Sequence, residues 1–197
     1  MPKVSEAHRV ARRRQILDAA ARCFARDGFH RTSMQDIVRE SGISAGLVYR
    51  YFAGKDDMIT AIVTEWHDQR QAVLATAPTA ARAAEGYLGL LASLGRPEAR
   101  DMVRLGVQIW AEAVRSPHIG DLARRNVDDP RAQVADLIRG AGAPAVRHAD
   151  PDALARVLIA IYQGLLLQTA WDETLDNDAY VSAVRALLDA LVVAPPD

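Results

Sequence analysis

The segment from Ser44 to Lys55 gathers side chains that suit the binding of an anionic polymer. It holds the hydroxyls of Ser44, Tyr49 and Tyr51 and the cations Arg50 and Lys55. A guanidinium can donate two hydrogen bonds to guanine O6 and N7, worth about 1–3 kcal/mol of discrimination between bases. Hydroxyls, ammonium groups and helix N-termini instead hold phosphate oxygens. These residue types point to nucleic-acid binding.

Their spacing places the key groups on one side of a short helix, expected over about 45–52. Val48 and Phe52 are four residues apart and can pack inward. The opposite face carries Ala45, Gly46, Tyr49 and Arg50. Small residues at its N-terminal end let this helix approach a DNA major groove closely. Tyr49 and Tyr51 lie about 200° apart around the axis, so at least one must face outward.

A second helix and a tight turn are expected to position this segment. The second helix should begin at Thr32, because Thr32 and Gln35 have the spacing of a capping box. Gly42 can take the left-handed conformation that reverses the chain, and Ser44 is expected to cap the next helix. Two short helices joined by a four-residue turn that contains glycine are typical of a helix-turn-helix.

Further phosphate contacts are expected around this motif. Ser33 and Ser44 lie at helix N-termini, where free N–H groups attract anions. Lys55 begins the following helix, where a cation meets the unfavourable end of the dipole, and a phosphate partner would explain its placement. The cations at positions 12–14 either add backbone or minor-groove contacts or form a solvated charged face.

The whole chain is expected to be all-α, because no strand-like alternation persists and Ala, Leu and Arg dominate. A first helix should span about 7–26 and a fourth should begin near Lys55. Later helices are expected at about 79–94, 97–105, 106–115, 119–140, 151–171 and 177–193. Pro130 predicts a kink or a restart, with Asp128 or Asp129 as the cap.

The net charge of −1 hides an asymmetry between the two parts of the chain. Residues 1–55 contain 11 Lys or Arg and 5 Asp or Glu, whereas residues 56–197 contain 13 and 20. The basic charge of residues 1–55 and the acidic charge of residues 56–197 suggest that only residues 1–55 bind a polyanion. Cys23 is the only cysteine and is expected to be a buried filler. No secretory signal or membrane span is expected, which predicts a cytoplasmic location.

The stretch from Ile16 to Ile62 resembles the DNA-binding domain of the TetR family of bacterial regulators. The most specific matches are Gly28, Phe29, Thr32, Ile37, Gly42, Ile43, Ser44, the run Tyr49 to Phe52, and Lys55. The resemblance implies an all-α dimer, with a DNA-binding domain at 1–55 and a ligand-binding and dimerisation domain at 56–197. It implies a repressor released by a small molecule and needs no cofactor or metal. The family's DNA-contact positions fall on Ser33, Ser44, Ala45, Gly46, Tyr49, Arg50, Tyr51 and Lys55.

The second part of the chain carries a looser resemblance to the choline-responsive BetI type, over residues 108–122 and 164–173, which does not imply a choline ligand. A palindromic DNA operator and a homodimer through the helices at 119–140 and 151–171 are expected. An internal pocket should take a small hydrophobic or aromatic ligand. Its expected liners, each of which has ordinary core packing as the alternative, are Trp66, Tyr87, Met102, Gln108, Trp110, Tyr162 and Trp171.

Two other functions compete with a ligand-gated repressor. An enzyme with a DNA-binding-like head is disfavoured, because the five histidines are scattered and no catalytic or phosphate-loop motif is present. A ligand-independent DNA binder would lack a pocket, so a cavity below roughly 300 Å³ would favour it. Activation in place of repression stays open, because it depends on operator position. Burial of Tyr49 and Arg50 inside the subunit would overturn the DNA-binding reading.

Overall fold

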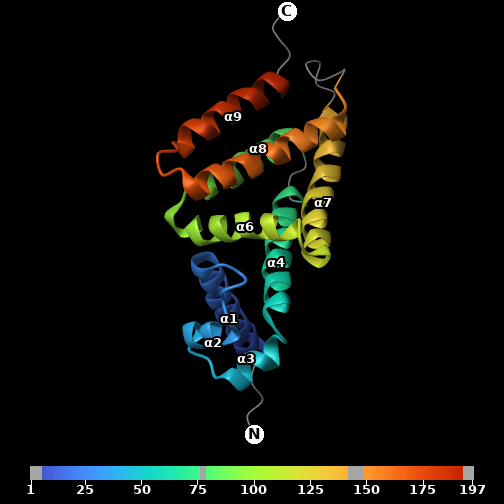
Figure 1. Cartoon of the computed structure of the whole chain (residues 1–197). Coiled ribbons are helices and arrows are strands. Elements are labelled where there is room, and N and C mark those ends of the chain that lie inside the picture. Colours follow the sequence, from blue (N-terminus) through green and yellow to red (C-terminus); the bar gives the residue numbers. More distant parts are fainter. Residues whose placement is uncertain (1–5, 76–78, 142–148, 193–197) are drawn as a thin grey trace, which may run out of the picture.

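The computed structural model describes residues 6–75, 79–141 and 149–192, and these residues form helices without any strand (Figure 1). The helices α1 (Glu6–Asp27), α2 (Met34–Ser41) and α3 (Ala45–Tyr51) lie together at one end, and α4 (Lys55–Ala75) runs from them into the rest. The remaining elements are α5 (Ala80–Leu94), a 3₁₀ turn (Pro97–Ala99), α6 (Arg100–Ala113), α7 (Pro117–Ala141), α8 (Pro151–Trp171) and α9 (Asn177–Val192). The expected all-α fold is confirmed.

The apolar core of the first three helices continues into the larger part of the chain. Ile16 and Phe24 of α1, Ile37 of α2 and Val48 of α3 are fully buried in one cluster. The same cluster takes in Met58, Ile59, Ile62 and Val63 of α4, Leu105 and Ile109 of α6, and Ile119 and Leu122 of α7. The helix-turn-helix is therefore packed on α4, α6 and α7 and does not stand alone.

The start of α2 lies one residue later than expected. Ser33 is the N-cap, and it forms the capping box with Asp36: Asp36 N–H donates to Ser33 Oγ at 3.2 Å, and Ser33 N–H donates to the Asp36 carboxylate at 2.9 Å. Thr32 is buried instead, and its hydroxyl reaches Gly28 O at 2.8 Å. Thr32 thus ties the α1–α2 loop to the end of α1.

The turn between α2 and α3 forms as expected around a left-handed glycine. Gly42 has φ of 65° and donates to Arg39 O, which closes α2. Ser44 stands at the N-cap of α3, but its side chain makes no capping hydrogen bond. The expectation that the Ser44 hydroxyl caps α3 is therefore wrong, and this exposed hydroxyl has no partner at the helix end.

Two expected breaks in the larger part are absent. The segments 97–105 and 106–115 form a short 3₁₀ turn followed by the single helix α6. Gly106 lies inside α6 and allows close packing, because a Cβ there would lie 3.1 Å from Leu166 Cδ1. Helix α7 likewise continues through Pro130 without a restart. Packing of α7 against α4, α6 and α8 offsets the lost backbone hydrogen bond.

Helix packing accounts for only part of the apolar composition of α8. This helix is long and apolar enough, by length and composition alone, to cross a membrane, and 17% of its most apolar stretch is buried inside the protein. It contacts α5, α6 and α7. Leu165 and Leu166 of α8 are buried with Leu91 and Val103 in a second core cluster. Other apolar side chains of α8 line the cavity described below or are exposed.

Replacing Gly42 with alanine should destabilise the protein, because an L-residue at its left-handed φ of 65° costs about 1–2 kcal/mol. Gly46→Ala is the matched control, since Gly46 is helical, has no positive φ and has nothing within 4 Å of an added Cβ. There alanine should stabilise by about 0.5–1 kcal/mol. Urea unfolding followed by circular dichroism measures both changes. Equal effects of the two substitutions would contradict the assigned turn.

Candidate nucleic-acid interface and internal cavity

Helix α3 presents the face that the spacing predicts. Val48 is fully buried and Phe52 nearly so, whereas Tyr49 is 53% exposed and Arg50 is exposed. Ala45 and Gly46 are exposed at the N-terminal end of the same helix. Tyr49 and Arg50 are therefore exposed, and their burial, which would have overturned the hypothesis of DNA binding, is not observed.

The neighbouring candidate contacts have different environments. Tyr51 is half-buried against the core, so Tyr49 is the outward tyrosine of the pair. Ser33 is exposed but its hydroxyl is engaged by Asp36, at 2.6 Å from the carboxylate. This hydrogen bond and a second from the Ser33 backbone hold the pKa of Asp36 below its ordinary value. Any phosphate contact by Ser33 competes with its capping role.

Lys55 is held by the protein itself. Its ammonium donates to Phe29 O at 2.8 Å and lies 4.9 Å from the centre of the Phe29 ring. These contacts fasten the start of α4 to the α1–α2 loop. A phosphate is not needed to explain a cation at this helix end, because the carbonyl and the ring already offset its charge. Contact of Lys55 with DNA stays a prediction.

The arginines near the start of α1 also have partners. Arg13 and Arg14 both bind the carboxylate of Glu65 on α4, at 2.6 and 3.0 Å. Arg12 donates to Gln15 at 2.7 Å. The two ion pairs with Glu65 brace α1 against α4.

The single cysteine, Cys23, is fully buried, and burial raises the pKa of its thiol, as expected for a residue that fills space in the core.

Two polar contacts near the junction of the helix-turn-helix and the larger part were not revealed by the sequence. His30 in the α1–α2 loop lies 2.8 Å from the Glu112 carboxylate of α6. Thr60 of α4 lies 3.0 Å from the imidazole of His118 in α7. No spacing pattern predicts contacts between residues that are 82 and 58 positions apart. The first contact joins the α1–α2 loop to α6, and the second joins α4 to α7.

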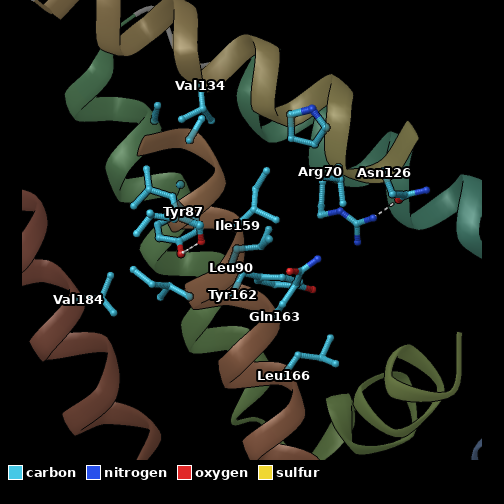
Figure 2. Close-up of a pocket in the computed structure, with 18 of the residues that line it drawn as sticks. Arg70, Tyr87, Leu90, Asn126, Val134, Ile159, Tyr162, Gln163, Leu166 and Val184 are labelled. Atoms are coloured by element: carbon cyan, nitrogen blue, oxygen red, sulfur yellow. Dashed lines mark hydrogen bonds between the residues drawn. The ribbon is translucent and has the colours of Figure 1, made fainter. Parts of the chain in front are cut away.

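A cavity of about 540 Å³ lies between α4, α5, α6, α7, α8 and α9 (Figure 2), and it is not fully enclosed, because Val157 and Leu187 in its lining are exposed. Most of its wall is aliphatic, with residues such as Leu90, Val134 and Leu166. Five of the seven expected liners lie on it, namely Trp66, Tyr87, Met102, Trp110 and Tyr162. The volume lies within the range of small-molecule sites, about 300–1,000 Å³.

The other two expected liners lie elsewhere. Gln108 is on the side of α6 that faces α1, where its Oε1 lies 3.9 Å from the position of a Cβ on Gly28. Trp171 ends α8 and is 69% exposed. Gln108 was misplaced because the sequence does not show which neighbour each side of α6 meets. Trp171 was misplaced because an aromatic residue in an apolar run is usually buried.

One end of the cavity is polar, and sequence reasoning missed its main residue. Arg70 of α4 donates to the Asn126 side chain (Figure 2), and the Tyr162 hydroxyl is close enough to interact electrostatically with it. Burial lowers the pKa of Arg70 and raises that of Tyr162. Tyr87 donates to Leu158 O at 2.6 Å and its pKa is raised by burial. An arginine on an amphipathic helix usually reaches solvent, so nothing in its spacing marked Arg70.

A patch of apolar side chains is exposed on the last two helices. It consists of Val157, Leu167 and Trp171 on α8 and Leu187 on α9. Among the described residues of α7, no large apolar side chain is exposed to the same degree.

Within the described ranges, no three His, Cys, Asp or Glu residues are grouped in a way that could hold a metal ion.

Lys55→Met should lower the free energy of unfolding by about 1 kcal/mol, because it leaves the Phe29 carbonyl without its hydrogen-bond donor. Arg50→Met, which removes an equal charge from the exposed face of α3, should leave stability within about 0.5 kcal/mol. Urea unfolding of both variants makes the comparison. If Lys55→Met changed DNA affinity alone and left stability intact, the tether to the α1–α2 loop would be disproved.

Comparison with known proteins agrees with this arrangement in both parts of the chain. Residues 16–62 match bacterial regulatory proteins of the tetR family, and residues 82–193 match the C-terminal domain of BetI-type transcriptional repressors. The chain is 32% identical to the HTH-type transcriptional repressor Rv1474c of Mycobacterium tuberculosis over 176 residues, covering 88% of this chain and 90% of that protein.

Two further relatives extend the comparison. The HTH-type nicotine-responsive transcriptional repressor HdnoR of Paenarthrobacter nicotinovorans is 28% identical, with 89% of this chain and 96% of HdnoR covered. A transcriptional regulator from Saccharomonospora viridis, solved in complex with choline, superposes with a TM-score of 0.75 at 28% identity, covering 94% and 100% of the two chains. The chain belongs to the TetR family and is a DNA-binding transcriptional regulator of the repressor type with a BetI-type C-terminal domain.

Proposed function

We propose that the protein represses transcription as a homodimer and releases its operator when a small organic molecule enters the cavity. Residues 1–55 would bind DNA, and residues 56–197 would bind the ligand and the partner subunit. The single observation that carries this proposal is the cavity of about 540 Å³ beside the helix that leaves the DNA-binding head.

The size of the cavity discriminates between ligand-gated and ligand-independent regulation. A binder without a ligand needs no internal space, and a cavity below roughly 300 Å³ was the expectation for it. The observed volume is well above this limit. The nicotine-responsive relative and the choline-bound neighbour support a small organic effector. The cavity of this chain has its own lining, so neither compound is carried over to it.

The DNA-contact surface is proposed from the exposed face of α3 and its surroundings. Arg50 and Tyr49 would reach base edges, and the small residues Ala45 and Gly46 would let α3 enter the groove. Ser44, with its free hydroxyl at the start of α3, would hold a phosphate. Ser33, Tyr51 and Lys55 would make secondary contacts, because each already has a partner within the protein.

The dimer is proposed to form through the apolar patch on α8 and α9. Two recognition helices must stand about 34–36 Å apart to read successive turns of a palindrome. The α8 segment at 151–171 belongs to the interface that the sequence predicted. The α7 segment at 119–140 lacks exposed large apolar side chains, whereas α9 contributes Leu187. We therefore assign α9 the place that the sequence analysis gave to α7.

Two further parts of the proposal follow from the same features. The chain acts where bacterial DNA is, in the cytoplasm, and without a membrane. Catalysis has no support among the described residues that line the cavity, because their polar groups form no acid–base pair and no nucleophile lies beside a base there. Repression in place of activation is favoured by the repressor relatives, and the operator position will decide it.

Arg50→Ala should weaken binding to a palindrome upstream of the regulated gene by about tenfold per half-site, because it removes one bidentate base contact. Arg125→Ala is the control, since Arg125 is an exposed cation on α7, away from α3. Quantitative gel shift at fixed salt measures both. Absence of sequence-specific binding by the wild-type protein at any salt concentration would refute the DNA-binding role.

Leu167→Glu should dissociate the proposed dimer, because it places a charge in the proposed interface and leaves no pairing partner. Leu167 is an exposed residue of the patch that does not line the cavity. Val114→Glu is the matched control, because Val114 is 88% exposed and lies outside the patch. Sedimentation velocity reports the mass, and gel shift reports the expected loss of operator affinity. A dimer that survives Leu167→Glu with unchanged mass would place the interface elsewhere.

A further inference from the structure

The polar end of the cavity contains a cation that no carboxylate neutralises. Arg70 donates a hydrogen bond to the neutral amide of Asn126, and the neutral hydroxyl of Tyr162 also interacts with it. Within the described ranges, no aspartate or glutamate forms an ion pair with it. Of the segments outside those ranges, 1–5, 76–78 and 142–148 contain no acidic residue, and 193–197 contains only Asp197. A guanidinium has five N–H donors, so these neutral partners leave its charge uncompensated.

A second arginine close to the cavity is paired with acids, so the lack of an acidic partner is particular to Arg70. Arg131 of α7 is largely buried, like Arg70, but it binds the carboxylate of Asp152 and lies 3.4 Å from that of Asp128. Burying a charge is costly unless it is paired and hydrogen-bonded. The protein pairs Arg131 with two acids and leaves Arg70 with none. The difference lies in position, because Arg70 borders the space that a ligand would fill.

The residues around Arg70 form a polar cap over an apolar chamber. Asn126 of α7 presents its carbonyl oxygen to Arg70 and donates through Nδ2 to Leu122 O at 2.9 Å, which fixes the orientation of the amide. Tyr162 and Gln163 of α8 lie on the other side of the guanidinium (Figure 2). The rest of the wall is aliphatic and aromatic, including Leu90 and Trp110.

We propose that the cavity selects ligands with a carboxylate at one end and an apolar body, with the carboxylate bound to Arg70. Planar guanidinium and carboxylate groups match in a bidentate pair, and a low-dielectric chamber strengthens it. The lowered pKa of Arg70 agrees with a site that lacks its counter-charge. The same cation repels ammonium compounds. This inference rests on the proposed ligand-gated function and names the ligand class for it.

The test compares head groups on constant apolar bodies by isothermal titration calorimetry with the full chain. One pair is decanoate and decan-1-ol, and the other is 1-naphthylacetate and 2-(1-naphthyl)ethanol, all below their aggregation concentrations. Decyltrimethylammonium is the cationic member of the first set. The acid should bind about tenfold or more tightly than the alcohol in at least one pair, and the ammonium compound should not bind.

Three variants assign this preference to Arg70. Arg70→Met keeps the bulk and removes the charge, so the acid should lose about tenfold or more in affinity while the alcohol is unaffected. Asn126→Asp is nearly isosteric and supplies Arg70 with a carboxylate, so it should abolish the preference even if Arg70→Met fails to fold. Arg125→Met removes an exposed charge from α7 and should preserve the preference.

Other outcomes would overturn the proposal. These are equal binding of acid and alcohol in both pairs, no binding of any of these compounds, or an acid preference that persists in both Arg70→Met and Asn126→Asp. Calorimetry needs no DNA, so these failures differ from failure of the proposed function. A protein that prefers acids but never binds an operator would retain this site and lose the repressor role.

Discussion

The burial of α4 in two places at once is the constraint on which the rest of the structure depends. Its first turns, with Met58, Ile59 and Ile62, are part of the core under the recognition helix. Its later turns carry Trp66 and Arg70 to the wall of the cavity. A helix packed at both ends cannot shift at one end without repacking at the other, because protein interiors are close-packed. Under the proposed function, ligand binding in the cavity would therefore be mechanically connected to the position of α3.

Contacts with α6 and α7 also limit how the DNA-binding domain, residues 1–55, can move when a ligand binds. The core under α3 continues into α6 and α7 through Leu105 and Ile119, and His30 meets Glu112 at the surface of the same junction. Lys55 fastens the start of α4 to the α1–α2 loop, so α1, α2 and α3 should follow α4 as one body. A ligand changes the equilibrium between arrangements only if it binds them unequally. The polar end of the cavity, on α4, α7 and α8, is where such a difference can arise.

Local signals in the sequence predicted the helix-turn-helix well and the larger part less completely. The turn at Gly42 and the outward face of α3 follow from backbone preference and helical spacing, and both are confirmed. The N-cap of α2 was displaced by one position because Thr32 and Ser33 both suit that role, and only the tertiary burial of Thr32 separates them. The expected boundary between helices at 105 and 106 does not exist, because Gly106 lies inside α6 and permits close contact with Leu166.

The cavity shows the same division between local and tertiary information. Large side chains on α4 to α8 predicted five of the lining residues, four of them aromatic, because aromatic residues on core helices border any space left between them, whereas the aliphatic majority of the wall was not predicted. Arg70 was not predicted, since its environment depends on Asn126 and Tyr162, which are 56 and 92 positions away along the chain. Trp171 and Gln108 were assigned to the cavity because the sequence does not state which face of a helix meets which neighbour.

The proposed coupling of the cavity to α3 through α4 is tested most directly by the distance between the two DNA-binding domains of the proposed dimer. Spin labels at Gln35→Cys, an exposed α2 position, report this distance by double electron–electron resonance, while native Cys23 is buried and unreactive. Val134→Trp, on the α7 side of the wall and outside α1 to α4, places a large side chain in the cavity. The account predicts a shifted distance distribution and weaker operator binding in this variant. An unchanged distribution with full operator affinity would contradict it.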